Sequence, residues 1–243
     1  MIALIKKEIG SFFSSVTGYV VIIVFLVISG LFIWVFPGEL NIPESGYATL
    51  DTLFIIAPWV FLFLVPAITM RMFAEERRSG TIELLLVRPL TDMQIVLAKF
   101  SAAVTMIVIS LLPTLIWFWS VHYLGNPPGN LDKGAIWGSY IGLIFLGGCY
   151  SAIGVFASSL TDNQIVAFIV AVLISFFFFT GFGMISILSM PLWLEEVFLY
   201  ISIDTHYKSI SRGVVDSRDV IYFIALITFF VFLTRTVLQS RKW

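Results

Sequence analysis

The sequence predicts an all-α integral membrane protein that crosses the bilayer six times. Hydrophobic residues make up 59% of the 243 residues and charged residues only 12%, and the mean hydropathy is +1.02. A soluble domain of this size would expose much of that apolar surface to water, so the composition is typical of membrane proteins. Six apolar runs are also long enough to cross a hydrocarbon core of about 30 Å as helices. A single transmembrane domain over residues 1–243 is therefore expected.

The composition also excludes several functions. The net charge of −1 gives no basic surface for nucleic acid, so no nucleic-acid partner is expected. Cys149 is the only cysteine, which rules out an internal disulfide and a cysteine-based metal site. His122 and His206 are far apart, and neither H-E-x-x-H nor the P-loop pattern occurs. We therefore expect no catalytic residues, no metal and no bound cofactor in this chain.

The chain is expected to begin with an amphipathic helix within residues 2–15 that lies at the membrane interface. Its apolar residues recur at three- and four-residue spacing, which places them on one face: Ile2, Ile5, Ile9, Phe12 and Phe13. The same pattern also suits a segment that only leads into the first span. That span is expected at 18–36, where 19 residues would extend about 28 Å.

Five further spans follow, separated by polar connectors. They are expected at about 53–70, 100–121, 136–160, 165–188 and 220–238. Pro58 and Pro66 make a kink plausible in the second span. The four phenylalanines at 176–179 surround the fifth helix, so lipid contact is expected for them rather than one ligand pocket. The connector 190–219 carries tryptophan and tyrosine residues typical of a membrane interface.

The distribution of positive charge fixes the expected orientation. Six spans place both termini on the same side of the membrane. With the N-terminus inside, ten of the fourteen Lys and Arg residues lie on the cytoplasmic side and the other four outside, so both termini are expected to be cytoplasmic. The span interiors as drawn contain no Asp, Glu, Lys or Arg, since Arg235 lies near the end of the sixth span, where its side chain can reach the interface. This disfavours a self-powered, ion-coupled transporter.

Two nearly identical heptapeptides begin the third and fifth predicted helices. LTDMQIV at 90–96 and LTDNQIV at 160–166 differ at one position. In each, a threonine three residues before a glutamine predicts a capping box: Thr91 with Gln94, and Thr161 with Gln164. We expect both segments to start their helices with the same cap.

The fourth span carries small residues at spacings of four, three and four: Gly147, Ser151, Gly154 and Ser158. Such a stripe lets a second helix approach closely. The partner is either another helix of this chain or a second subunit.

The segment 71–99 is the longest charged island of the sequence. It contains Arg71, Arg77, Arg78, Arg88 and Lys99. Residues 72–79 are expected to form one charged helix, Gly80 to permit a bend, and 81–87 to form a second helix with Ile82, Leu85 and Leu86 on one face. On these residues alone, the island is either a surface element that receives force from a partner or an ordinary solvated loop.

The island also carries a family resemblance. Residues 75–85, EERRSGTIELL, with Pro89-Leu90 after them, resemble the coupling segment of ABC-2 type transporter permeases. Asp162-Asn163-Gln164 and the stretch 206–216 are similar to that family as well. Residues 124–130 and 153–168 are most similar to the gliding-motility-associated ABC permease subunit of Bacteroidota. The resemblance implies the ABC-2, type V exporter-like permease fold.

The resemblance further implies a permease subunit of a bacterial cytoplasmic (inner) membrane that does not itself hydrolyse ATP. A second permease copy would pair with it, and an ABC ATPase subunit carrying ATP and Mg would dock beneath. The residues implied for ATPase coupling are Glu75, Glu76, Arg77, Arg78, Ser79, Gly80, Thr81, Ile82 and Glu83. The coupling segment implied spans 71–99, and Pro89 is expected to end its helical part.

The same resemblance implies an outer partner. A membrane-anchored auxiliary protein with a large extracytoplasmic domain would meet an extracytoplasmic rim formed by 190–219. Its candidate residues are His206, Arg212 and Asp216. Arg212 and Asp216 are four residues apart and could pair on a helix.

The function implied is the coupling of ATP hydrolysis on a partner to export or to extracytoplasmic work associated with gliding motility. The alternative is a mechanotransmitting scaffold subunit that moves no solute and drives the auxiliary protein.

Overall fold

The computed structural model describes residues 1–83, 90–186 and 191–240, and every regular element in these ranges is helical. Several predicted features lie outside the described residues, namely Leu85, Leu86, Arg88, Pro89, most of the second helix of the charged island, and the end of the fifth span.

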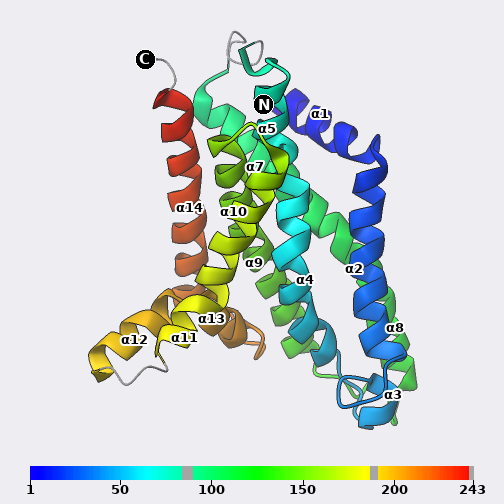
Figure 1. Ribbon diagram of the computed structural model, residues 1–243. Coiled ribbons are helices and arrows are strands. Elements are labelled where there is room, and N and C mark those ends of the chain that lie inside the picture. Colours follow the sequence, from blue (N-terminus) through cyan, green and yellow to red (C-terminus); the bar gives the residue numbers. More distant parts are fainter. Residues whose placement is uncertain (84–89, 187–190, 241–243) are drawn as a thin grey trace.

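Six helical segments are long and apolar enough to cross a membrane, as predicted (Figure 1). They are Val16–Trp34, Asp51–Arg78, Asp92–Leu124, Lys133–Leu160, Gln164–Ile185 and Ser217–Gln239. The third begins eight residues before the predicted start at 100, so Lys99 lies inside the helix. The prediction that the spans contain no charged residue is therefore wrong for this one.

Helix α9 (Lys133–Leu160) forms the centre of the bundle. It packs against α4 (Asp51–Thr69), α7 (Asp92–Leu111), α10 (Gln164–Phe176) and α14 (Ser217–Gln239). Most of its residues are buried, many of them glycine, alanine or serine. Small side chains let several helices approach one backbone closely, which explains why this sequence occupies the core. α2 (Val16–Trp34) packs mainly on α4 and keeps much of its apolar surface exposed.

Besides the second, which consists of α4 and α5 (Arg71–Arg78) on either side of Met70, two of the spans are interrupted. α7 passes through the short η1 (Leu112–Thr114), which contains Pro113, into α8 (Leu115–Leu124). Proline cannot donate the helical hydrogen bond, which accounts for the break. In the fifth span, α10 passes through the π-helical η2 (Phe177–Gly181) into α11 (Phe182–Ser186).

The phenylalanine run at 176–179 divides between two environments. Phe176 and Phe177 are exposed, as lipid contact requires, whereas Phe179 is 2% exposed. The prediction of lipid contact is therefore wrong for Phe179. Its ring lies against Trp59 at 5.4 Å and Tyr150 at 6.2 Å, because this side of the helix faces α4 and α9.

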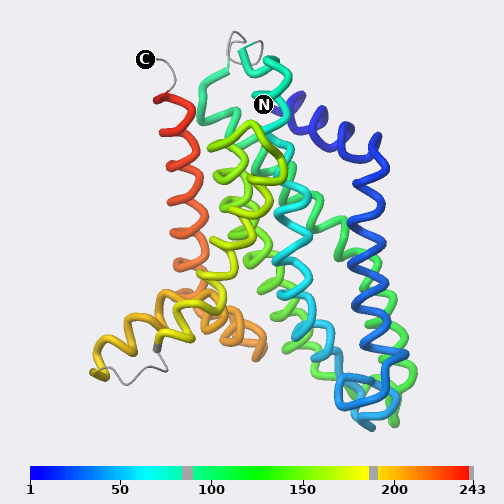
Figure 2. Tube along the Cα trace, in the orientation of Figure 1, coloured from blue at the N-terminus to red at the C-terminus, as the bar shows by residue number. Residues whose placement is uncertain are grey.

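The two ends of the bundle differ in their short helices. α1 (Ile2–Phe13) and α5 (Arg71–Arg78) lie at the end where α14 finishes, so both ends of the chain reach the same side (Figures 1 and 2). At the opposite end lie α3 (Ile42–Ser45), and α12 (Leu192–Ile201) with α13 (Ile203–Ile210). α12 has no buried residue and extends away from the bundle beside α11 (Figure 1). The connector predicted at 190–219 is thus mainly helical.

Candidate functional site

The charged island begins as α5, which continues α4 after Met70. Ser158, in the last turn of α9, fixes this junction. Its hydroxyl accepts hydrogen bonds from the backbone N–H groups of Phe73 (3.0 Å) and Ala74 (3.1 Å) and donates one to the carbonyl of Met70 (2.9 Å). One serine therefore satisfies backbone groups that a helix junction otherwise leaves unpaired. This contact ties the charged island to the core of the bundle.

The small residues of α9 allow α4 and α7 to pack closely against it. A Cβ added at Gly154 would lie 2.0 Å from the Thr69 hydroxyl oxygen, and one at Gly147 would lie 2.9 Å from the side chain of Ile107. Ser151 is also fully buried. Of the two partners considered for this stripe, the structure places helices of the same chain against it.

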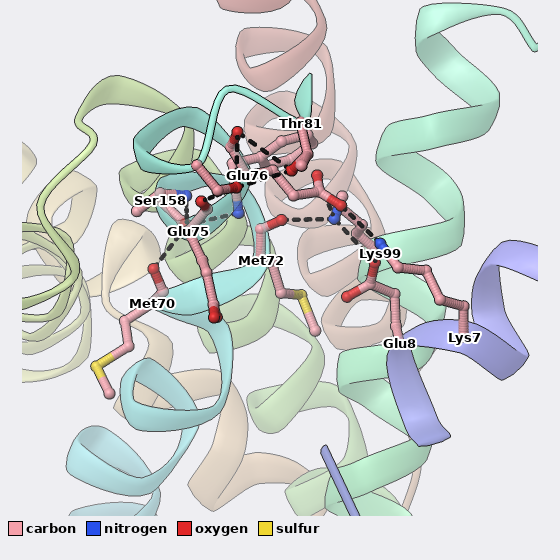
Figure 3. A network of polar contacts seen from close by, with 12 residues as sticks. Lys7, Glu8, Met70, Met72, Glu75, Glu76, Thr81, Lys99 and Ser158 are labelled. Carbon is pink, nitrogen blue, oxygen red and sulfur yellow. Dashed lines mark hydrogen bonds and ion pairs between the residues drawn. The ribbon is translucent and has the colours of Figure 1, made fainter. Parts of the chain in front are cut away.

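Lys99 is the most deeply buried charge of the site. Its side chain is 0% exposed, and its ammonium nitrogen lies 3.0 Å from Glu8 and 2.9 Å from Glu76 (Figure 3). It also donates to the carbonyl of Met72, and it lies 5.0 Å from the centre of the Phe73 ring. Two of these oxygen atoms, from Glu8 and Met72, accept hydrogen bonds from the ammonium group, and Glu76 adds an ion pair. A buried charge is tolerated only when it is paired in this way.

Lys7 completes the group, which we call the charged cluster: Lys7, Glu8, Glu76 and Lys99. The Lys7 amine lies 2.9 Å from Glu76 and 3.5 Å from Glu8. Burial alone lowers the pKa of Lys7, but the hydrogen bond to Glu76 and the charges of both carboxylates raise it above 10.5 overall. Two amines and two carboxylates thus join α1, α5 and α7 with no net charge.

The outward side of α5 has a different character. Glu75 and Arg78 are exposed, and so are Ser79, Thr81 and Glu83 in the turn that follows. Gly80 has φ +69°, a left-handed conformation that ends the helix and that glycine adopts without strain. The bend predicted there is confirmed. Ile82 packs partly buried against the core, as predicted.

A cleft of about 370 Å³ separates α1 from α5 beside these residues. Its walls include Lys7, Glu8 and Ser11 from α1, and Arg71 and Glu75 from α5. Arg71 donates to the hydroxyl of Thr17 at the start of α2. The site therefore combines a rigid, ion-paired interior with an exposed polar surface. Such an arrangement suits protein contact.

No group of three or more metal-binding side chains occurs in the described ranges 1–83, 90–186 and 191–240. The charged cluster pairs amines with carboxylates and contains no hydroxyl or thiol nucleophile.

The two predicted capping boxes have different outcomes. At α7, Thr91 accepts from the N–H of Gln94, and the Gln94 side chain accepts from the N–H of Thr91, so this box is confirmed. At α10 the prediction is wrong. Asn163 caps the helix by accepting from Ile165, while Thr161 accepts from Asn163 instead. The single difference between the heptapeptides, Asn163 in place of Met93, supplies a better cap two residues later.

The residues predicted for the rim also differ from expectation. Arg212 and Asp216 do not share a helix, since α13 ends at Ile210, and Asp216 instead caps α14 by accepting from the N–H of Arg218. No ion pair joins the two in the part of the chain that the structure describes. His206 is buried, and its ring nitrogens lie 2.7 Å from Asp219 and 2.9 Å from the carbonyl of Tyr200.

Sequence reasoning missed Lys7, Glu8 and Lys99 as parts of the site. Glu8 and Lys99 are 91 residues apart, and nothing in either local pattern indicates the other. The sequence does give a partial signal that Glu76 faces inward. Glu76 lies on the same face of the predicted helix as Met72 and Phe73, which are apolar.

These observations define a helical membrane protein with six candidate spans and a polar contact surface at the end that carries α1 and α5. A family model described as "ABC-2 family transporter protein" matches residues 43–238. Because this match covers most of the chain, the protein belongs to that family. A comparison with curated proteins found no match.

The family supplies the coarse function. Its membrane domain indicates a multi-pass membrane subunit of an ABC transporter, typically without catalytic activity of its own, and implies association with an ABC ATPase subunit.

Proposed function

We propose that the exposed side of α5 and the turn after it receive the ABC ATPase subunit, and that the charged cluster passes the movement on to α1 and α7. One observation carries this proposal. α5 is fixed on its inner side by Ser158 and Lys99, yet presents Glu75 and Arg78 outward. ATP binding on the partner would favour one of two arrangements of the spans through contacts that differ between them.

The nine residues implied for coupling then divide by role. Glu75, Arg78, Ser79, Thr81 and Glu83 would touch the ATPase, because they are exposed. Glu76 would act inside the chain, since its two carboxylate oxygens face Lys7 and Lys99. Gly80 would shape the turn, and Ile82 would hold it against the core. Arg77 is only partly buried, but its Nε is buried and has no hydrogen-bond partner among the described residues, so we assign it no contact with the ATPase.

Charge reversal of the outward residues tests the docking. We would co-purify the ABC ATPase subunit with the full chain in lipid nanodiscs and measure binding and ATP turnover. The variant Glu75→Lys with Arg78→Glu should lose most of both while keeping the fold, because both side chains are exposed and neither belongs to the charged cluster. Glu39→Lys is the matched control, because Glu39 is exposed in the loop before α3, at the other end of the bundle. Unchanged binding and turnover in the double variant would overturn the proposal.

The orientation and location are part of the same proposal. The ten-to-four distribution of positive charge supports an arrangement with both termini and α5 in the cytoplasm of a bacterial cell, and the chain in its cytoplasmic membrane. Reporter fusions after Ser45 and after Gln239 test it. Activity of a cytoplasmic reporter only at the second position is the expected result.

The larger assembly is proposed from the family resemblance. Two copies of this permease would pair over two ATPase subunits, and a membrane-anchored auxiliary protein would meet the end formed by α12 and α13. The similarity of residues 124–130 and 153–168 to the gliding-motility permeases of Bacteroidota supports a role in surface gliding. Loss of gliding after deletion of the gene, restored by the wild-type chain only, is the expected outcome.

One observation bears on what is moved. A groove of about 730 Å³ along α2 and α4 is lined only by apolar side chains, including Val24, Phe32 and Phe63. This supports either an amphipathic cargo or the mechanotransmitting alternative, in which no solute crosses, over a hydrophilic solute. A lipid-like probe that competes for a photoreactive label at Phe63 would favour cargo.

A further inference from the structure

The buried pair of His206 and Asp219, which we call the rim pair, joins three helices at the end of the bundle opposite α1 and α5. His206 lies on α13, Asp219 on α14, and the carbonyl of Tyr200 belongs to α12. Both side chains are only 8% exposed. The imidazole also stacks on Tyr222, with 3.9 Å between ring centres and 18° between ring planes.

The hydrogen-bond partners of His206 determine how many protons the pair must hold. A backbone carbonyl can only accept, so Nε2, 2.9 Å from the Tyr200 carbonyl, must carry a hydrogen. A carboxylate also only accepts, so Nδ1, 2.7 Å from Asp219, must carry one too. A neutral imidazole has a single N–H. The observed geometry therefore needs one proton more than a neutral histidine beside a carboxylate provides.

The position of Asp219 indicates where that proton resides. Asp216 is the N-cap of α14, so Asp219 is in its first turn. The positive end of the helix dipole favours a carboxylate there. This position favours the arrangement of an imidazolium paired with a carboxylate, whose second oxygen is buried without a hydrogen-bond partner among the described residues. Loss of the proton would leave a buried, unbalanced carboxylate and turn the lone pair of Nε2 or Nδ1 toward an oxygen, both of which are costly.

We propose that the rim pair is a proton-binding site that holds α12, α13 and α14 together while it is protonated and loosens α12 when the proton leaves. This inference does not depend on ATPase coupling. After deprotonation the single remaining N–H would stay with Asp219, because charge-assisted hydrogen bonds are the stronger ones. The hydrogen bond from Nε2 to the Tyr200 carbonyl, at the end of α12, then breaks.

The surroundings of the pair support a local change. α12 has no buried residue and packs mainly on α11, so few contacts tie it to the bundle. α13 is held independently, since the Tyr207 hydroxyl donates to the carbonyl of Phe54 at 2.8 Å, and burial raises the pKa of Tyr207 so that it remains a donor. At the junction of α12 and α13, the Tyr222 hydroxyl donates to the carbonyl of Ile201, and the Ser202 hydroxyl donates to the carbonyl of Phe179. Because Tyr222 on α14 still donates to the carbonyl of Ile201, the last residue of α12, the loss is confined to the contact at the Tyr200 carbonyl.

Other titratable groups on the packed elements are phenols, a thiol and charged side chains at the surface. On α13 itself, Asp204 and Lys208 form their own ion pair. The η2 segment that packs on α13 contains only Phe, Thr and Gly. The remaining groups on α12, α14 and α9 are Tyr200, Glu195, Glu196, Tyr222, Arg218, Arg235, Lys133, Tyr140, Cys149 and Tyr150. Asp219 is the carboxylate in hydrogen-bond contact with His206 within the described residues.

Nitrogen NMR of ¹⁵N-histidine-labelled protein in nanodiscs tests the proton count directly. The chain has two histidines, and His122→Gln assigns their signals. At pH 7 we expect both ring nitrogens of His206 to be protonated. In Asp219→Asn the amide can donate to Nδ1, so one nitrogen should be unprotonated while the packing is kept. One unprotonated nitrogen in the wild type would overturn the proposal, and this spectrum decides even if a variant misfolds.

Hydrogen exchange of α12, compared with that of α9 in the same sample and corrected for intrinsic rates, tests the release. Exchange in the wild type should rise severalfold between pH 6 and pH 9. It should stay low in Asp219→Asn and high in His206→Ala at both pH values. If the exchange of α12 in the wild type did not change with pH and matched that of Asp219→Asn, proton loss would not be coupled to movement of α12.

Discussion

The charged cluster, centred on the buried Lys99, and the buried rim pair are both ionic contacts that join three helices, yet they lie at opposite ends of the bundle and differ in chemistry. The charged cluster pairs two lysines with two glutamates. Such side chains ordinarily keep their charges around neutral pH. The rim pair depends on histidine, the side chain whose charge changes in that range. The comparison teaches that one fold can hold a lysine–glutamate connection at the end that carries α1 and α5 and a histidine–aspartate connection at its far end.

Removal of the Lys99 charge should produce the largest loss of stability, and it tests whether the charged cluster is a structural connection. Lys99→Met leaves the Glu8 and Glu76 carboxylates buried without their central cation. Loss of one member of a buried ion pair costs about 3–5 kcal/mol, so the thermal unfolding temperature of the purified protein should fall sharply. The triple variant with Glu8→Gln and Glu76→Gln should recover much of the loss. If Lys99→Met melts like the wild type, the charged cluster is not a structural connection.

Removal of the Ser158 hydroxyl should have the next largest effect. Ser158→Ala leaves two buried N–H groups and one carbonyl of the α4–α5 junction without this partner, at about 1–3 kcal/mol for unsatisfied groups. Ser151→Ala is the matched control, because the Ser151 hydroxyl is buried in the same stripe without a hydrogen-bond partner among the described residues, and its loss should cost little. Equal unfolding temperatures for the two variants would contradict this account of how α5 is held.

Removal of the caps in the two heptapeptides should destabilise the protein by a smaller amount. Asn163→Ala should destabilise the protein by about 1 kcal/mol through loss of the α10 cap, and Thr161→Ala should cost less. At α7 the order of positions differs, since Thr91→Ala removes the cap and Met93 has no capping role. Thermal unfolding of the three alanine variants measures this. A larger loss from Thr161→Ala than from Asn163→Ala would favour the capping box over the observed cap.

The smallest effect concerns pH and sharpens the contrast between the two ends. The pKa of Lys7 is raised in the folded protein, so its contribution is fully present below pH 10.5 and is lost as pH rises through the folded value. Lys7 is largely exposed, so the contribution is under about 1 kcal/mol. The difference in unfolding free energy between wild type and Lys7→Met should be constant from pH 7 to pH 9 and shrink above pH 10.5. If this difference instead changed around pH 7, a group in the charged cluster would titrate there, and the contrast between the two ends would be wrong.

Local sequence signals predicted the features that depend on local physics. Apolar runs gave the six spans, the Thr91–Gln94 spacing gave the first cap, and Gly80 gave the left-handed turn, because each depends on neighbouring residues. The charged cluster depends on a contact between Glu8 and Lys99 that only the tertiary fold creates.

The remaining errors have similar causes. Asn163 displaced the predicted cap because two capping residues competed within three positions. Phe179 became buried because α4 and α9 cover one side of its helix, which the run of four identical residues could not indicate.

The central claim, that the turn after α5 meets the ABC ATPase subunit, is tested most directly by cysteine cross-linking. Cys149 is buried and is the only cysteine, so single replacements suffice. Thr81→Cys and Glu39→Cys would be compared in the complex, with and without ATP. We predict that Thr81→Cys cross-links to the ATPase with a yield that changes on ATP binding, while Glu39→Cys does not. An intact complex in which Thr81→Cys gives no product, or Glu39→Cys gives it instead, would contradict the account.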